Sequence, residues 1–167
     1  MATRRGNGEA GLGDHHRGSR RPGLTVWAYC DTSALVKRYV REPGRRKLLA
    51  LLSERSCASS ALTPVEIRSA FRRRVHEGSL AATRLPTLLN RLAADRSHWT
   101  LVAVGPEVLA VAETLAATHP LRALDAIHVA SAQLFSARMP APPLFVSADR
   151  RQADVAGAMG LTVRFIE

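Results

Sequence analysis

Aromatic residues are scarce in this chain of 167 residues: Phe, Trp and Tyr make up 5% of it, although hydrophobic residues make up 46%. Ala, Leu and Val must therefore build most of the core, which is typical of helices packed on a sheet. Because the chain has only two Trp and two Tyr, a platform that stacks on the bases of single-stranded nucleic acid is poorly supported. The length suits one domain.

Cysteine and long apolar runs are scarce too. The two cysteines, Cys30 and Cys57, lie in short apolar segments with no CxxC or Cys/His spacing, which favours reduced core thiols over a disulfide or a zinc site. No apolar run approaches the roughly 20 residues that cross a bilayer. The opening MATRRGNGEAGLGDHHRGSR has no apolar stretch and does not resemble a secretory signal. We therefore expect a cytoplasmic protein without a membrane segment.

Acidic residues are outnumbered, with 14 Asp and Glu against 24 Lys and Arg, so the formal net charge is +10. A basic balance of this size favours polyanionic partners such as nucleic acid, because their phosphates release counterions when Lys and Arg bind them. Solvated arginine-rich helix faces and acidic protein partners are equally compatible with it.

The chain divides into two parts. Residues 1–23 are rich in Gly, Arg, His and Ser without periodicity, which predicts a disordered basic tail. Residues 24–167 alternate between apolar runs and helical patterns, which predicts one α/β domain with a mostly parallel sheet covered on both faces. The predicted strands are 24–31, 57–62, 99–104, 144–149 and 161–166. The predicted helices are 33–40, one that opens at Pro43, 63–77, 80–95 with Pro86 as a candidate kink, 106–119, 122–137 and 150–159.

Four acids fall at the ends of these segments. Asp31 and Asp149 follow strands directly, whereas Glu66 and Asp125 lie in the first turn of a helix. Since the carboxyl ends of parallel strands meet at one edge of a sheet, we expect the four to converge there.

Each acid also has a purely structural interpretation. Asp31 and Asp149 suit helix caps, and Asp125 suits the positive end of a helix dipole. Thr63 and Glu66 have the spacing of a capping box, which for Glu66 alone is the favoured interpretation. These alternatives do not explain why all four acids lie on one side of the sheet in a basic chain.

Convergent carboxylates repel one another, so they either raise their pKa values or recruit a cation. Oxygen ligands without His or Cys favour Mg²⁺ or Mn²⁺ over zinc. Such a site, ringed by arginines, suits phosphodiester hydrolysis, because the metal lowers the pKa of a water molecule and neutralises charge that develops on the phosphate.

Four segments, in this order, carry a family resemblance: DTSALVKRY, Thr-Pro-x-Glu, LDAIHVASA and VSADRR. They resemble the acidic motifs of PIN-domain ribonucleases, most closely the toxins of VapBC toxin–antitoxin modules. The resemblance covers residues 24–167 and implies a PIN-like three-layer α/β/α fold. It also implies a Mg²⁺- or Mn²⁺-dependent endoribonuclease, usually a homodimer, which a cognate antitoxin protein encoded beside it holds inactive.

The resemblance assigns roles to particular residues. It makes an acidic quartet catalytic and metal-binding, and it gives two serines, Ser147 and Ser33, the task of orienting water or carboxylates. The quartet consists of Asp31, Glu66, Asp125 and Asp149. The tail departs from the family pattern, so we expect the native chain to start near Val26 instead of at Met1.

Basic residues follow two of the acids and are candidates for holding RNA phosphates: Lys37, Arg38, Arg68 and Arg72. A solvated helix face explains any one of them equally well. His128 is expected to be a packed histidine and not a base. The leucines of residues 80–92 are expected to belong to the core, with a dimer face as the alternative.

Two rival functions were weighed against the nuclease. A haloacid-dehalogenase-like phosphatase needs a second acid two residues after the first, and that position is Ser33, which excludes it. A non-catalytic PIN-like module that binds RNA or protein stays open, although a degenerate domain should have lost an acid and none is missing. The RNA target stays open as well.

Overall fold

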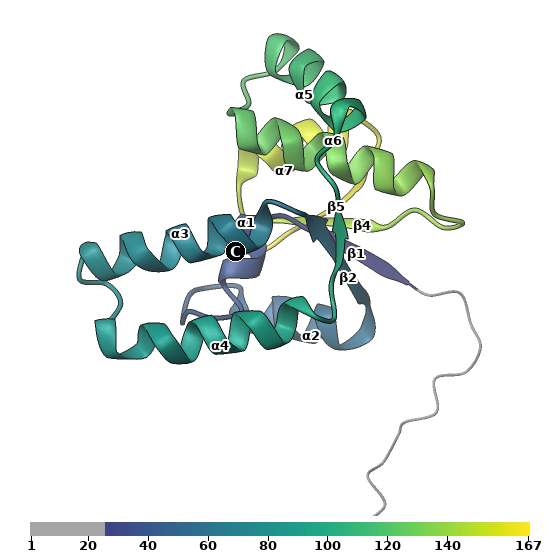
Figure 1. The fold of residues 1–167 in the computed structure, drawn as a ribbon. Helices are drawn as coiled ribbons and strands as arrows, with labels where there is room; N and C mark the ends of the chain where they lie inside the picture. The colour runs from purple at the N-terminus through teal and green to yellow at the C-terminus, as the bar shows by residue number, and fades with distance from the viewer. Residues whose placement is uncertain (1–25) are drawn as a thin grey trace, which may run out of the picture.

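The structure is a computed structural model that describes residues 26–167. In this part of the chain five strands form one sheet in which every pair is parallel, in the order β3-β2-β1-β4-β5 (Figure 1). The strands are β1 (Trp27–Cys30), β2 (Ser56–Ser60), β3 (Thr100–Val102), β4 (Leu144–Ser147) and β5 (Thr162–Phe165). The predicted parallel sheet is confirmed.

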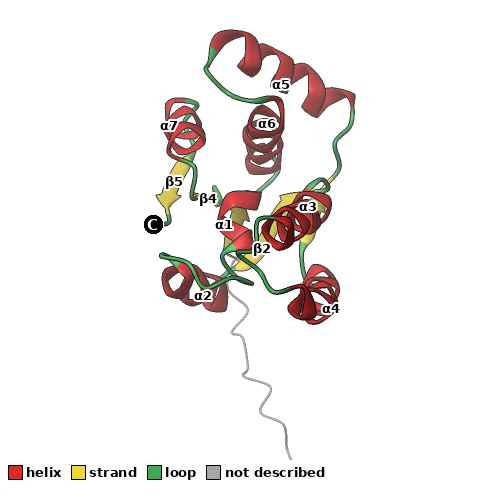
Figure 2. Ribbon diagram, turned by 90° about the vertical axis from the view of Figure 1, so that its left-hand side faces the viewer, coloured by secondary structure: helices red, strands yellow, loops and turns green. Residues whose placement is uncertain are grey.

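Helices cover both faces of the sheet, so the predicted three-layer α/β/α architecture is confirmed as well (Figure 2). One face carries α5 (Pro106–Thr118), α6 (Ala123–Ala137) and α7 (Arg150–Ala158). The other face carries α1 (Thr32–Val36), α2 (Arg45–Glu54), α3 (Thr63–His76) and α4 (Leu85–Arg96).

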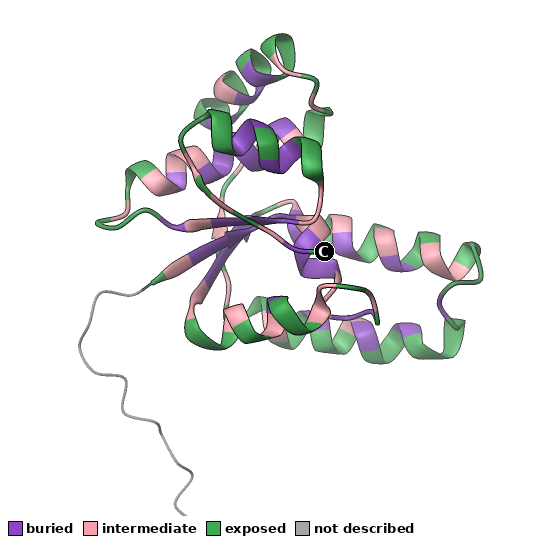
Figure 3. Cartoon of the chain, turned by 180° about the vertical axis from the view of Figure 1, so that it is seen from behind, coloured by how far each residue is buried: buried purple, intermediate pink, exposed green. Residues whose placement is uncertain are grey.

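The central strand β1 serves two cores because successive side chains of a strand point to opposite faces. Ala28 and Cys30 belong to the buried cluster under α1–α4, whereas Tyr29 belongs to the cluster under α5–α7. The Tyr29 ring stacks on Phe145 of β4 with 5.9 Å between the ring centroids. Cys30 and Cys57 are buried free thiols, as predicted. Figure 3 shows the buried residues concentrated on the sheet and on the helix faces that meet it.

The predicted helix over residues 80–95 exists, but its predicted first residue is wrong, because the helix begins at Leu85. Gly78 (φ 73°) takes the left-handed conformation after α3, and the Ser79 hydroxyl donates to the Arg74 carbonyl, so these residues cap the end of α3. A 3₁₀ turn over Ala82–Arg84 follows, and α4 begins at Leu85. Pro86 therefore lies in the first turn, where a missing N–H costs no hydrogen bond, and it does not kink the helix.

Other boundaries shift by a few residues. The first helix ends at Val36 and not at residue 40, and α2 begins at Arg45 and not at Pro43. The prediction that the leucines of residues 80–92 belong to the core is confirmed, because four of them are buried in the cluster under α1–α4: Leu80, Leu85, Leu88 and Leu92.

Two predictions concern residues outside the described range, namely the disordered tail over residues 1–23 and a native start downstream of Met1. Within residues 26–167, no helix has the length and apolar character to span a membrane.

Candidate active site

The sheet changes its direction of winding between β1 and β4. The chain moves from β1 outward to β2 and β3, then crosses back and places β4 on the other side of β1. Such a switch point leaves a crevice at the carboxyl ends of the two strands, where open α/β sheets bind ligands. Asp31 follows β1 at this point, Ser147 ends β4, and Asp149 lies two residues beyond it.

Asp31 is held rigidly and is only 1% exposed. Its carboxylate caps α1 by accepting the backbone N–H of Ala34 at 2.8 Å, and it also accepts the hydroxyls of Ser33 (2.8 Å) and Ser147 (2.7 Å). Burial raises the pKa of Asp31, although the charge of His128 and these hydrogen bonds oppose the rise. Asp31 therefore caps α1, and this does not conflict with the interpretation that it also binds a ligand at the edge of the sheet.

Glu66 is not part of a capping box, so the interpretation favoured from its local spacing is wrong. Thr63 is the first residue of α3, and its hydroxyl lies 2.6 Å from that of Ser59. The Glu66 Oε2 atom instead accepts the Thr32 hydroxyl at 2.7 Å and lies 2.8 Å from His128 Nε2. Burial opposes ionisation, but the hydrogen bond and charge of His128, with the bond from Thr32, hold the pKa of Glu66 below its ordinary value.

His128 contacts Glu66 of α3 and two residues close to Asp31 in the chain, Thr32 and Tyr29. It is 2% exposed, which confirms the prediction of a packed histidine, and its Nε2 also lies 3.1 Å from the Thr32 hydroxyl. Its Nδ1 lies 3.4 Å from the Tyr29 hydroxyl. Two features of the sequence point to these residues: Thr32 adjoins Asp31, and His128 lies one helical turn after Asp125. Their shared contact with Glu66 joins residues that are 34 and 62 positions apart, and no local pattern shows that.

Asp125 and Asp149 both lie at the amino-terminal end of a helix: Asp125 is in the first turn of α6, and Asp149 directly precedes α7. Asp125 Oδ2 accepts the Arg122 backbone N–H at 3.3 Å at the start of α6, and Asp149 Oδ1 accepts that of Gln152 at 3.3 Å at the start of α7. Burial raises the pKa of Asp125, the bond from Arg122 opposes the rise, and the charge of Asp149 adds to it. The two carboxylates are therefore electrostatically coupled through their like charges.

Two side chains connect these acids to Asp31. Besides donating to Asp31, the Ser147 hydroxyl accepts the Asp149 backbone N–H at 3.0 Å. Gln152, which is 1% exposed, places Oε1 3.2 Å from Ser147 Oγ and donates from Nε2 to the Asp125 carbonyl at 3.2 Å. Gln152 is not among the residues predicted from the sequence, where its only signal is its position three residues after Asp149.

The structure thus joins Asp31, Asp125 and Asp149 through one set of hydrogen bonds at the switch point. Glu66 belongs to a separate set with Thr32 and His128, and the four acids are not gathered into a finished ligand cluster. Within residues 26–167, no three His, Cys, Asp or Glu side chains stand together as a group that could hold a metal ion. None of Asp31, Asp125 and Asp149 forms a salt bridge within the same residues.

A sequence profile of the PIN domain matches residues 28–158, which include all four acids. The chain belongs to the PIN-domain family. It is 38% identical over 141 residues to Ribonuclease VapC35 of Mycobacterium tuberculosis, an alignment that covers 81% of this chain and 93% of that protein. The resemblance noted from the four motifs is confirmed at the level of the family.

Solved structures agree on the fold of this PIN domain. A toxin–antitoxin complex from Klebsiella pneumoniae matches with a TM-score of 0.58 and 17% identity, covering 82% of this chain and 95% of that one. VapBC2 from Rickettsia felis, bound to a DNA fragment from its promoter, matches with a TM-score of 0.59 and 11% identity, covering 84% and 99%.

The basic residues predicted to hold RNA differ in their surroundings in this PIN domain. Arg38 is engaged, since Nε and Nη2 donate to the two oxygens of Asp95 at 2.6 and 2.7 Å. Lys37 donates to the Pro43 carbonyl at 3.0 Å. Arg68 and Arg72 are exposed on α3. An RNA contact by these four residues stays a prediction.

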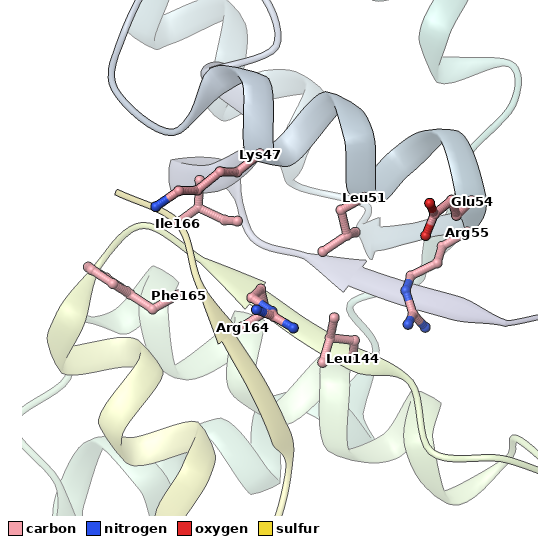
Figure 4. A pocket seen from close by; sticks show the side chains of 8 residues that line it. All are labelled: Lys47, Leu51, Glu54, Arg55, Leu144, Arg164, Phe165 and Ile166. Atoms are coloured by element: carbon pink, nitrogen blue, oxygen red, sulfur yellow. The ribbon is translucent and has the colours of Figure 1, made fainter.

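The residues that line two cavities of the PIN domain show which of them adjoins the four acids. One of about 370 Å³ opens beside Thr32 and Glu66, and it is walled by apolar residues that include Val65 and Leu124. Another of about 310 Å³ lies between α2 and the strands β4 and β5 (Figure 4) and contains none of the four acids. The first cavity therefore belongs to the candidate active site, and the second does not.

Proposed function

We propose that this PIN domain is a metal-dependent endoribonuclease that hydrolyses RNA phosphodiester bonds as the toxin of a VapBC-type toxin–antitoxin pair. The observation that carries the proposal is the buried Asp31 at the β1–β4 switch point, joined through Ser147 to Asp149 and through Gln152 to Asp125. The 38% identity to a protein named as a ribonuclease supports the same conclusion.

The residues present fit a divalent cation. Asp31, Asp125 and Asp149 offer carboxylate oxygens, which Mg²⁺ and Mn²⁺ prefer. Burial raises the pKa values of Asp31 and Asp125, which means that their ionised forms are destabilised and that a bound cation would stabilise them. Both hydrogen bonds to Glu66 reach Oε2, which leaves Oε1 for a fourth ligand.

A bound cation would supply a water of lowered pKa and neutralise charge on the scissile phosphate. The chain's own residues prepare the site for this chemistry. Ser33 and Ser147 fix the Asp31 carboxylate from two sides. His128 and Thr32 keep Glu66 ionised at neutral pH, so it can accept a hydrogen bond from water or ligate the cation.

We further propose that a cognate antitoxin binds this chain and that the chain forms a homodimer. Val65 and Leu124 beside the cavity near Glu66 are 67% and 46% exposed, and exposed apolar residues grouped around a cavity suit a protein partner. A cytoplasmic location stays a prediction from the sequence.

The test is cleavage of total cellular RNA by the purified chain with Mg²⁺ or Mn²⁺, in parallel with EDTA and with Asp125→Asn. A matched control is Asp154→Asn, which changes an exposed acid of α7 outside the network. Discrete cuts that require the metal and Asp125 but not Asp154 would support the nuclease. RNA binding without any cut, across both metals, would instead favour the non-catalytic module.

A further inference from the structure

A cavity of about 450 Å³ on the α2 and α4 side of the molecule has an unusual lining. It lies apart from the four acids and contains no carboxylate. Seven of its lining residues are cationic or carry a hydroxyl: Arg41, Arg45, Arg84, Arg91, Thr83, Thr87 and Tyr39. The cleft of Figure 4 differs, because its three cations share the lining with Glu54 and with apolar side chains.

The charges of the four arginines are not paired within the described residues, although the charge of Arg91 acts on the Asp95 carboxylate. None of them forms a salt bridge there, although seven other ion pairs are present in residues 26–167. Like charges that face one cavity repel, so an anion bound among them would lower the electrostatic energy. Arginine suits phosphate in particular, because its planar fork donates two parallel hydrogen bonds to two oxygens.

Two helix ends add to this charge. Helix α2 begins at Arg45 and α4 begins at Leu85, next to Arg84, and neither has a side-chain cap on its first N–H groups. Their first amides are bonded to backbone carbonyls, Arg45 N–H to that of Glu42 and Leu85 N–H to that of Ala82, so it is the positive ends of the two helix dipoles that favour an anion near the same cavity.

One of the cavity's cations, Arg91, is held in place by an aromatic ring. Tyr39 lines it and is 4% exposed, and the Arg91 guanidinium lies 5.9 Å from the centroid of the Tyr39 ring. A cation held over an aromatic ring loses less freedom when it binds a ligand. Burial raises the pKa of the Tyr39 hydroxyl, and the charge of Asp95 adds to the rise.

We propose that this four-arginine cavity, defined by Arg41, Arg45, Arg84 and Arg91, binds backbone phosphates of RNA outside the acidic site. The inference rests on the proposed function, which makes RNA the substrate. The cavity follows closely on the acids along the chain, because α1 begins next to Asp31 and is about 7.5 Å long, and Tyr39 comes three residues after its end. One strand of several nucleotides can therefore reach both places.

The test measures binding of a fluorescein-labelled 30-nucleotide single-stranded RNA in EDTA, where metal-dependent cleavage is absent. Arg45→Gln/Arg91→Gln removes two cavity cations, one from α2 and one from α4. The matched control, Arg46→Gln/Arg96→Gln, removes two exposed cations from the same two helices outside the cavity. Both variants carry the same net charge.

We expect the cavity variant to bind about 25-fold more weakly at 0.1 M salt, with the slope of log K against log salt reduced by about 1.4, since each phosphate contact on a single strand contributes roughly 0.7. The control should lose less than about threefold. Arg45→Lys/Arg91→Lys should recover most of the salt slope, which separates charge from folding defects, and equal unfolding midpoints for all variants complete that check.

Equal loss in the cavity and control variants would overturn the proposal. So would a cavity that binds poly-glutamate through these arginines while RNA affinity is unchanged, because its ligand would then be an acidic protein segment. If the wild-type chain cuts RNA but Arg45→Gln/Arg91→Gln and Arg46→Gln/Arg96→Gln bind RNA with equal affinity, the cavity proposal fails and the nuclease proposal stands. If binding depends on the cavity and no RNA is cut, the nuclease proposal fails alone.

Discussion

His128 should matter for stability as well as for the site, because its Nε2 lies 2.8 Å from Glu66 Oε2 and, among the described residues, the Thr32 hydroxyl is the other partner of that oxygen. We predict that His128→Leu, which keeps a similar volume, leaves the Glu66 carboxylate with the Thr32 hydroxyl alone. The two side chains are 3% and 19% exposed, so the surrounding water screens the pair only in part.

The expected magnitude follows from this geometry. A hydrogen bond to a charged group contributes about 1.5–3 kcal/mol net, and the half-buried carboxylate left behind adds to the cost. We therefore expect a loss of about 2–4 kcal/mol in the free energy of unfolding at pH 7, or roughly 5–12 °C in melting temperature for a domain of this size.

A double-mutant cycle isolates the pair. Urea denaturation of the wild type, His128→Leu, Glu66→Gln and the double variant, all without metal, should give a coupling energy above about 1.5 kcal/mol. Thr32→Val, which removes a neutral donor to the same oxygen, should cost only about 1 kcal/mol. A coupling below about 0.5 kcal/mol would refute the reasoning.

The coupling should also depend on pH in one direction. The pKa of Glu66 in the folded protein is lowered, so the pair stabilises the fold above the unfolded value of roughly 4.3 and this contribution disappears as pH falls through the lowered pKa. The same cycle repeated at acid pH should therefore show a shrinking coupling energy, and a coupling that grows would contradict the assignment.

Three further predictions concern other parts of the chain. Gly44→Ala should destabilise the fold by about 2–4 kcal/mol in urea titrations, because Gly44 has φ 80° and an added Cβ would lie 2.5 Å from the carbonyl oxygen of the last residue; an unchanged midpoint would contradict that contact. Addition of Mg²⁺ at about 100 times its dissociation constant should stabilise the wild type by about 2.7 kcal/mol in calorimetry, with the effect lost in Asp149→Asn and kept in Asp154→Asn. Arg38→Gln should cost about 1–2 kcal/mol of stability through its lost bidentate pair with Asp95, and an effect on RNA binding with none on stability would show that the pair is weak.

Much of the fold was predictable because strand and helix periods differ and because strand ends are marked by polar residues. Asp31 and Asp149 could be placed at one edge of the sheet from that alternation alone. The start of α4 could not, since Gly78 and Ser79 suit both the end of one helix and the start of another, and only the bond from Ser79 to the Arg74 carbonyl decides between them.

The site shows the same division. The four acids could be named from their positions, but their partners depend on contacts between distant segments. Glu66 fits a capping box in sequence, yet its hydrogen bonds go to Thr32 and His128, which are 34 and 62 positions away. Arg38 likewise looks free in sequence although Asp95 pairs with it across 57 positions. Local spacing carries no information about these tertiary contacts.

The Ser147 hydroxyl has a single proton, but four possible acceptors lie within its reach, of which the Ser33 hydroxyl is the farthest at 3.4 Å. Asp31 Oδ2 is nearest at 2.7 Å, whereas the Asp149 carbonyl and Gln152 Oε1 each lie at 3.2 Å. The proton therefore goes to the buried carboxylate while that carboxylate is uncompensated. A cation bound at Asp31 would compensate the charge of that carboxylate, and rotation of this one hydroxyl would then redirect the proton to Gln152 or to the carbonyl. The network can thus exchange one donor arrangement for another by a bond rotation, without any movement of the backbone.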